Sequence, residues 1–508
     1  MLFNSYVFIL LFLPLTVILF HLCRHLGYSR LAVFVLILAS LIFYGFWSIK
    51  YLFLLLSLTL INFCMAKAII AARKKNSQSA KLFLILGIIL NLSILAYYKY
   101  ANFFVDNVNQ LLAANITLAY IILPIGISFF TFQKIAFLKD IYDNKVSKLN
   151  FMNFLLFVTF FPQLIAGPIV HHSEIMPQLT NLKKVTPRFF LKGITFLTIG
   201  LAKKVLLADT AAKFASPAFN AVAGGQHLDF LAAWSAALAY AVQLYFDFSA
   251  YSDMAIGMAL FFGIYLPINF NSPYKSSSII EFWRRWHITL SRFLRDYLYI
   301  PLGGNRKGPT RRYINLYLTM LLGGIWHGAG WTFVIWGALH GIYLIINHKW
   351  HELNSALVIK IRKSTPKVVA TILTFLAVVI AWIFFRAANV HTAFDILKSM
   401  GGGYGFALPP SFASLGIPLP VSTSPVDSGL GLLVALILLV LTWTAPNTQQ
   451  LTSYIGPQGV HNKEVQKISY QLSFRWKPSL PWAIATGCLF ALCLMMFTQV
   501  SEFIYFQF

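Results

Sequence analysis

Apolar runs long enough to cross a bilayer recur along this chain from end to end, and they limit what it can fold into. A helix needs about 20 apolar residues to cross the hydrocarbon core, and such runs occur from residues 6–22 to residues 481–499. Only 11% of the 508 residues are charged, against about 25% in a soluble domain. Because water cannot solvate most of this surface, we predict an all-α polytopic membrane protein.

The runs predict one helical domain over residues 1–508, with no soluble domain boundary. We expect roughly ten to thirteen embedded helices, because some runs are short and segments 100–114 and 390–400 fit an interfacial or re-entrant position. The first run lacks a basic start and a cleavage site, so it is predicted to be a retained span, with a signal peptide as the alternative. The candidate segments are residues 6–22, 31–48, 51–70, 82–98, 117–135, 150–167, 189–208, 229–249, 253–268, 313–326, 331–347, 369–386, 429–445 and 481–499.

The charge distribution supports the same fold class. A formal charge of +25 would suggest nucleic acid as the partner of a soluble protein, but here the basic residues lie between apolar runs. This is the positive-inside pattern. The expected partner is therefore the lipid bilayer, and no nucleic-acid partner is expected. Basic loops, including Arg284 to Arg312 and Lys360 to Lys367, are predicted to be cytoplasmic, and the N-terminus to lie outside. The four cysteines form no CxxC pair, so no disulfide framework or metal site is expected.

Residues 279–298, IIEFWRRWHITLSRFLRDYL, are too charged to span a bilayer. On a helical wheel their apolar and charged residues fall on opposite arcs, which predicts one continuous amphipathic helix at the membrane interface. His287 lies within the apolar arc, where a leucine would bury more favourably. Because a buried imidazole requires a partner, His287 is a candidate functional residue, and a hydrogen-bonded core histidine is the alternative.

The loop that follows, IPLGGNRKGPTRR, combines turn-forming glycines with positive charge from Arg306 to Arg312. Such a loop can bind phosphate through its backbone, so it is a candidate site for an anionic acyl donor such as coenzyme A. Anchoring by the positive-inside rule is the simpler alternative.

The next apolar segment contains His327 and His340, and ionisable groups at membrane depth are candidates for function. His327 is the stronger candidate because glycines at 323, 324, 328 and 330 surround it and are expected to weaken the helix locally. A histidine can take a proton from a hydroxyl or thiol that attacks an acyl carbonyl. No G-x-S-x-G motif supplies a separate nucleophile.

Asp247 and Asp253 are also embedded, as are Gln133 and Lys134. Six residues apart on an unbroken helix, the two carboxylates point about 120° away from each other. They therefore do not form a facing acid/base pair. Each is expected to hydrogen-bond to hydroxyl groups or to hold a histidine tautomer.

Six segments of the chain carry distinctive motifs: LPIGISFFTFQ at 123–133, FPQLIAGPIV at 161–170, YFDFSAYSDMAIG at 245–257, INFNSPYKSSSIIEFWRRWHITLSRFLRDYLYIPLGGNRKG at 268–308, GGIWHGAGWTFVIWGALHG at 323–341 and WIFFRA at 382–387. These segments resemble the membrane-bound O-acyltransferase family, and within it the bacterial branch that acetylates alginate. The resemblance covers most of residues 120–390. It implies a helical bundle with a tunnel that joins a cytoplasmic donor to an acceptor on the other face.

The resemblance implies specific site residues. His327, in the I-W-H-G motif, is the implied catalytic histidine, and His287, in W-H-I-T, is the implied second site on the cytoplasmic side. No bound cofactor is implied, and acetyl-CoA is the expected donor. The candidate donor-binding residues are Arg284, Arg285, Trp286, Asn305, Arg306 and Trp326.

The implied function is O-acetylation of an exopolysaccharide such as alginate, with periplasmic acetyltransferases as partners of a multi-pass protein in the bacterial inner membrane. Peptidoglycan, cellulose and teichoic acid remain alternative acceptors. From other classes, a transporter or flippase with a histidine relay and a non-catalytic scaffold remain open alternatives.

Overall fold

The computed structural model describes residues 1–146, 149–165, 167–353, 365–415, 420–457, 475–497 and 503–504. Over these residues the chain is helical and forms no β-strand, and its β-type pairing is an isolated bridge between Leu408 and Val421. The all-α prediction is confirmed. Most of the basic run predicted from Lys360 to Lys367 lies outside the described residues.

The contacts divide the chain into two compact units that alternate along the sequence. Unit 1 comprises Met1–Leu201, Tyr251–Ile268 and Thr452–Phe506, and unit 2 comprises Ala202–Ala250, Asn269–Leu451 and the last two residues. The chain passes from unit 2 to unit 1 within a single helix, α11 (Phe230–Phe261). The single domain expected over residues 1–508 stays a prediction, because one embedded domain can contain two compact units.

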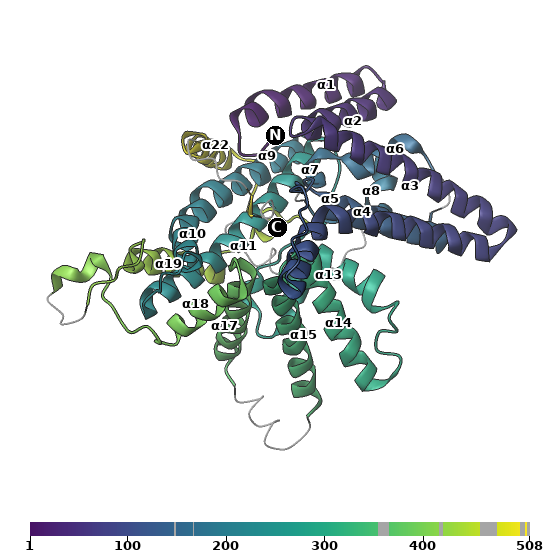
Figure 1. Cartoon of the computed structure of the whole chain (residues 1–508). Coiled ribbons are helices and arrows are strands. Elements are labelled where there is room, and N and C mark those ends of the chain that lie inside the picture. The colour runs from purple at the N-terminus through teal and green to yellow at the C-terminus, as the bar shows by residue number, and fades with distance from the viewer. Residues whose placement is uncertain are drawn as a thin grey trace. The chain divides into compact units, whose positions relative to one another are not determined.

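Unit 1 contains the long hairpin of α3 and α4, whose helices lie side by side in Figure 1. Its elements are η1 (Val7–Phe12), α1 (Leu13–His25), α2 (Ser29–Gly45), α3 (Ile49–Lys75), α4 (Ser77–Leu112), α5 (Ile127–Tyr142), α6 (Phe151–Thr159), α7 (Phe161–Leu164), α8 (His172–Thr180), α9 (Pro187–Ala202) and α22 (Leu480–Met495).

Unit 2 contains the motif-bearing segments and the hairpin of α14 and α15. Its elements are η2 (Lys203–Ala208), α10 (Asp209–Ala223), the first part of α11, η3 (Pro273–Lys275), α12 (Ile279–Arg285), α13 (Ile288–Leu294), η4 (Arg295–Tyr299), α14 (Gly308–His327), α15 (Trp331–Glu352), α17 (Lys367–Arg386), α18 (Val390–Met400), η5 (Pro410–Leu415), α19 (Ser428–Thr444) and α20 (Thr448–Thr452).

Among the described residues, four helical segments are long and apolar enough to cross a membrane: Val7–His25, Ile49–Lys74, Ser77–Leu112 and Lys367–Arg386. At about 1.5 Å per residue, such helices match the thickness of the hydrocarbon core. The larger number of embedded helices expected from sequence stays a prediction, because the remaining helices are shorter, broken or more polar.

Three predicted boundaries differ from the structure. The runs 229–249 and 253–268 were predicted as separate spans, whereas α11 continues through the polar residues between them to Phe261. Residues 100–114 were predicted as an interfacial or re-entrant segment; up to Leu112 they continue α4, and no glycine or proline occurs between Tyr100 and Leu112. The run 117–135 becomes helical only at Ile127.

Close packing between α14 and α15 depends on glycines that face each other. A Cβ atom at Gly337 would lie 2.6 Å from the carbonyl oxygen of Met320 and 3.1 Å from the Cα of Gly324. Small residues allow embedded helices to approach this closely. The glycines before His327 were expected to weaken the helix, but α14 continues through them and ends at His327. Their role in the structure is to allow the backbone of α15 to pack closely against α14.

Gly337→Ala should therefore force α14 and α15 apart. Overpacking of this kind costs about 1–3 kcal/mol, so we expect a clearly lower midpoint of thermal unfolding for the detergent-solubilised protein. Gly487→Ala on α22 is the matched control, because nothing lies within 4 Å of the added methyl group. Equal melting of the two variants would contradict the assigned role of the glycine contact.

Candidate active site

A break in the amphipathic segment determines the position of His287. Residues 279–298 were predicted to form one continuous helix, which is wrong: α12 ends at Arg285 and α13 begins at Ile288. His287 has a φ of 41°, in the left-handed region that non-glycine residues adopt only at a cost. Its burial therefore comes from the break, and not from a position on the apolar arc of one helix.

The side chain of Asn269 holds this break together. Its Oδ1 accepts hydrogen bonds from the backbone N–H of Thr289 at 3.3 Å and the hydroxyl of Thr289 at 2.9 Å, and it lies 3.1 Å from Nδ1 of His287. All three side chains are fully buried. Because the N–H of Thr289 can only donate, the atom facing it is the amide oxygen, so Nδ1 of His287 carries a proton. The neutral imidazole then has its lone pair on Nε2.

Backbone hydrogen bonds complete the contact between the break and the segment that begins at Asn269. The N–H of Ile288 donates to the carbonyl of Asn269 at 2.9 Å, and the N–H of Asn271 donates to the carbonyl of Arg285 at 2.9 Å. These bonds satisfy polar groups that the end of α12 and the start of α13 would otherwise leave unpaired. Asn269 was not among the site residues predicted from sequence, because its partners are about 20 residues away along the chain.

His327 is the last residue of α14, and its side chain is only 4% exposed. Three aromatic rings surround the imidazole nearly edge-on, with centroid distances of 4.7 Å to Trp326, 4.9 Å to Trp336 and 5.2 Å to Phe385. Gly328 and Gly330 have extended backbone conformations, and the chain bends between them before α15 begins. The expected irregular backbone is therefore present directly after His327.

His340 lies on α15 and is fully buried. Nε1 of Trp283 donates to its Nδ1 at 3.3 Å, and its ring stacks on Phe282 with the centroids 6.1 Å apart. Since an indole N–H can only donate, the neutral imidazole carries its proton on Nε2. Among the described residues, neither this Nε2 nor the indole nitrogen of Trp336 has a hydrogen-bond partner. Two buried donors are thus available in this region, which is uncommon in a protein interior.

A continuous set of ring contacts in unit 2 links the three histidines, and we call it the histidine–aromatic cluster. The ring of His287 lies 4.7 Å from that of Phe248, and the rings of Trp336 and Trp382 are stacked 5.9 Å apart. Dense aromatic packing excludes water, so the imidazoles lie in a dry environment. The members of the histidine–aromatic cluster are His287, His327, His340, Phe248, Phe270, Trp286, Trp326, Trp336, Trp382 and Phe385.

The two arginines before this break differ in their surroundings. Arg284 is exposed, whereas Arg285 forms an ion pair with Glu281 at 2.8 Å and donates to the carbonyl of Asn271 at 3.3 Å. Partial burial of Glu281 opposes its ionisation, but hydrogen bonds from Ser277 and the Arg285 guanidinium outweigh this and lower the pKa of the carboxyl. The Arg285 guanidinium is therefore engaged by partners within the protein, whereas Arg284 remains accessible.

The basic loop after η4 is folded onto α14. Gly303 and Gly304 have φ values of 109° and 55°, and the fully buried Asn315 donates to the carbonyl of Gly304 at 2.9 Å. Asn305 and Arg306 are exposed. The residues predicted to bind the acyl donor are thus divided between two places. Trp286 and Trp326 belong to the histidine–aromatic cluster, whereas Asn305 and Arg306 lie at the surface.

Asp247 is part of a buried ion network that the sequence did not predict. Lys204 is 2% exposed, and its Nζ lies 3.0 Å from Asp247 and 2.8 Å from Asp209. A buried charge requires such a partner, and a lysine that follows an apolar run is the sequence signal. In unit 1, the fully buried Lys134 lies 4.4 Å from the ring centroid of Phe130, a cation–π contact.

Within the described ranges, no group of three or more His, Cys, Asp or Glu side chains is placed to hold a metal ion. The four cysteines have free thiols.

The profile of the membrane-bound O-acyltransferase family matches residues 36–390, which is more than half of the chain. The chain belongs to this family. Its membership accounts for the polytopic helical fold and makes the protein an O-acyltransferase.

Relatives within the membrane-bound O-acyltransferase family are named for different acceptors of the acyl group. The chain is 45% identical to a peptidoglycan O-acetyltransferase of Helicobacter pylori, over 80% of this chain and 81% of that protein. It is 38% identical to a probable alginate O-acetylase of Azotobacter vinelandii over the full length of both. A teichoic acid D-alanyltransferase of Streptococcus thermophilus is 30% identical over 44% of this chain and 57% of that protein.

Asn269→Leu should destabilise the break that positions His287. The substitution leaves buried donors of His287 and Thr289 without an acceptor, at about 1–3 kcal/mol for each unsatisfied group. We expect a lower unfolding midpoint in detergent and faster proteolysis between α12 and α13. Asn181→Leu, at an exposed loop position, is the control. If Asn269→Leu melts like wild type, the amide does not hold the break.

Proposed function

We propose that this protein transfers an acetyl group from cytoplasmic acetyl-CoA across the membrane, for O-acetylation of a polysaccharide of the bacterial cell envelope. The observation that carries the proposal is the burial of His327 within the histidine–aromatic cluster of a membrane-bound O-acyltransferase. An imidazole in a dry site is suited to moving protons during acyl transfer. Family membership supplies the reaction class.

In the proposed reaction, His327 takes the proton of an acceptor hydroxyl as the oxygen attacks the thioester carbonyl. The new C–O bond forms, the C–S bond breaks, and the proton passes to the departing thiolate, so that an ester and a free thiol result. The indole N–H of Trp336 and the Nε2–H of His340, both without a partner among the described residues, are the proposed donors to the carbonyl oxygen.

His287 is the second proposed catalytic residue, with a role on the donor side. Because Nδ1–H of His287 donates to the side-chain oxygen of Asn269, Nε2 of His287 is the ring nitrogen that can accept and return a proton. The phosphates of acetyl-CoA would be held by exposed cations, principally Arg284 and Arg306, through charge-assisted hydrogen bonds. Trp286 and Trp326 would contact the acyl end of the donor.

Two acceptors have specific support. Alginate or a similar exopolysaccharide is supported by the probable alginate O-acetylase of Azotobacter vinelandii, whose similarity covers the full length of the chain. Peptidoglycan is supported by a relative with 45% identity. In either case the protein would lie in the inner membrane and pass the acetyl group to a periplasmic acetyltransferase. A transporter or flippase role has weaker support, because the family is defined by acyl transfer.

His327→Ala should abolish acetyl transfer while the protein remains folded. Loss of a general base lowers rates by about 10²- to 10⁴-fold, so we expect at least a hundredfold loss of labelled acetyl transfer from acetyl-CoA to glycan or partner protein in proteoliposomes supplied with the periplasmic acetyltransferase. His25→Ala, at an exposed position of α1, is the matched control. Full activity of His327→Ala would contradict the proposed mechanism. Movement of glycan across the membrane without acetylation would favour a flippase.

Arg306→Ala tests the donor side separately. If the guanidinium binds a phosphate of acetyl-CoA, its loss should raise KM for the donor by about tenfold with little change in kcat, as expected for binding shared by substrate and transition state. Arg295→Ala, which removes an exposed arginine already paired with Asp296, is the control. Unchanged donor KM in Arg306→Ala would place the donor site elsewhere.

A further inference from the structure

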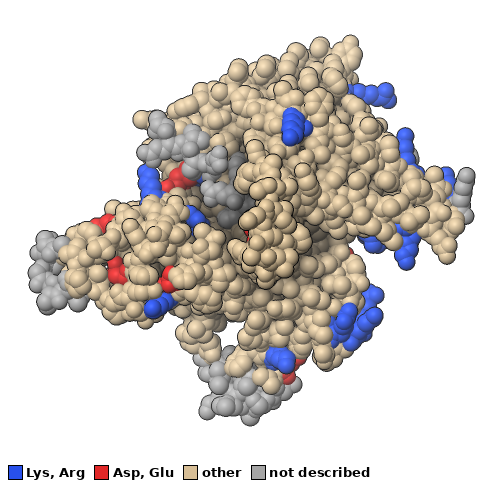
Figure 2. All heavy atoms as spheres, in the orientation of Figure 1, with Lys and Arg blue, Asp and Glu red and all other residues tan. Residues whose placement is uncertain are grey.

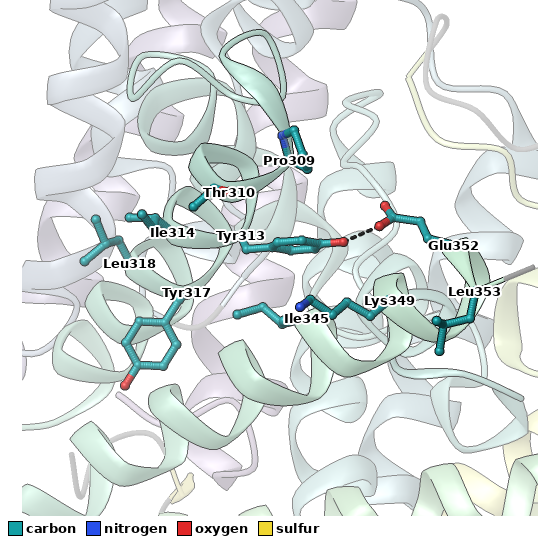
Figure 3. A pocket seen from close by; sticks show the side chains of 10 residues that line it. All are labelled: Pro309, Thr310, Tyr313, Ile314, Tyr317, Leu318, Ile345, Lys349, Glu352 and Leu353. Carbon is teal, nitrogen blue, oxygen red and sulfur yellow. Dashed lines mark hydrogen bonds between the residues drawn. The ribbon is translucent and has the colours of Figure 1, made fainter.

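A groove of about 710 Å³ lies between the start of α14 and the end of α15, at the end of the hairpin opposite His327. Figure 3 shows its lining side chains, which project from both helices toward the space between them. The groove is separate from the histidine–aromatic cluster and shares no residue with it. Its lining residues are Pro309, Thr310, Tyr313, Ile314, Tyr317, Leu318, Ile345, Lys349, Glu352 and Leu353.

The walls of the groove are mainly hydrocarbon. Ile314 is 42% exposed and Leu353 is 51% exposed, so large apolar side chains line it without being covered by protein. The exposed apolar surface continues along the hairpin with Leu322, Ile342 and Ile346. In a membrane protein such a surface faces lipid chains, and the groove is a recess in that surface.

The polar end of the groove carries excess positive charge. Glu352, its one carboxylate, forms an ion pair with Arg312 at 2.7 Å and accepts a hydrogen bond from the Tyr313 hydroxyl. The Tyr313 bond and the Arg312 guanidinium lower the pKa of Glu352, so it is ionised and already paired at neutral pH. Within the part of the chain that the structure describes, Lys349 has no carboxylate partner, and its Nζ lies 5.5 Å from the Tyr313 ring centroid.

More cations surround this end. Arg306, Lys307 and Arg311 are exposed in the loop and first turn that lead into α14, and Figure 2 shows blue side chains gathered over that part of the hairpin. Basic residues between embedded helices at the cytoplasmic boundary are suited to anionic lipid headgroups. The charge and the apolar walls therefore indicate an amphiphile with a negative head and a hydrocarbon tail.

We propose that this groove binds one anionic phospholipid. Its phosphate pairs with the Lys349 ammonium and accepts from the Thr310 hydroxyl at the rim, and an acyl chain packs along Ile314, Leu318 and Ile345. Acetyl-CoA fits less well, because its pantetheine arm carries amides that these walls cannot hydrogen-bond. A bound lipid would also connect α14 to α15 at the end remote from His327.

The test is lipid retention by the full-length protein, purified in a neutral detergent and examined by native mass spectrometry with phosphatidylglycerol or phosphatidylcholine. We expect preferential retention of phosphatidylglycerol and a raised unfolding midpoint, since a ligand of the folded state stabilises it. Lys349→Gln should weaken phosphatidylglycerol binding about fivefold, which corresponds to ~1 kcal/mol for one cation at the headgroup.

Two further variants make the result decisive. Lys50→Gln is the matched control, because Lys50 is also an exposed lysine near a tyrosine ring, 5.9 Å from the centroid of Tyr51, and does not line the groove. Ile345→Trp should fill the groove and reduce retention of both lipids. Equal retention of the two lipids by wild type, or wild-type binding by Lys349→Gln, would overturn the proposal. Displacement of the lipid by acetyl-CoA would assign the groove to the donor instead.

Discussion

Hydrocarbon offers no hydrogen bonds, so every backbone group and polar side chain at membrane depth must find its partner within the protein. Long helices meet this requirement by themselves, as α4 and α17 do. A break in a helix meets it only if other parts of the chain supply donors and acceptors. The break before α13 is possible because the segment beginning at Asn269 provides both backbone and side-chain partners. These hydrogen-bond partners thereby determine the position of His287.

The same constraint explains how His327 is placed. Glycines allow α14 and α15 to approach until backbone atoms are in contact, and the turn between the helices follows directly after His327. Large aromatic rings fill the remaining space around the imidazole. Small residues and large rings are therefore complementary parts of one arrangement, in which the glycines fix the hairpin and the rings exclude water from its end.

Buried charges follow a similar rule, and they show why an embedded ionisable residue need not be catalytic. Lys204 and Asp247 neutralise each other within unit 2, and Lys134 lies against an aromatic ring in unit 1. By contrast, the Nε2 of His340 and the indole of Trp336 keep unused donors among the described residues. The histidine–aromatic cluster therefore contains spare hydrogen-bond donors beside His327, which a reacting carbonyl could satisfy.

The sequence by itself determined the all-α membrane fold and the family, and it pointed to His327 and His287 as candidate site residues, because apolar length, charge placement and local motifs are properties of adjacent residues. It did not determine that the amphipathic segment breaks at His287, that Asn269 fixes the imidazole tautomer, or that Lys204 neutralises Asp247. Each of these depends on partners distant in sequence, which only tertiary packing brings within hydrogen-bonding distance. The glycines before His327 illustrate the same point. Their presence in the sequence suggested a weakened helix, whereas the structure shows that they allow α14 and α15 to pack closely.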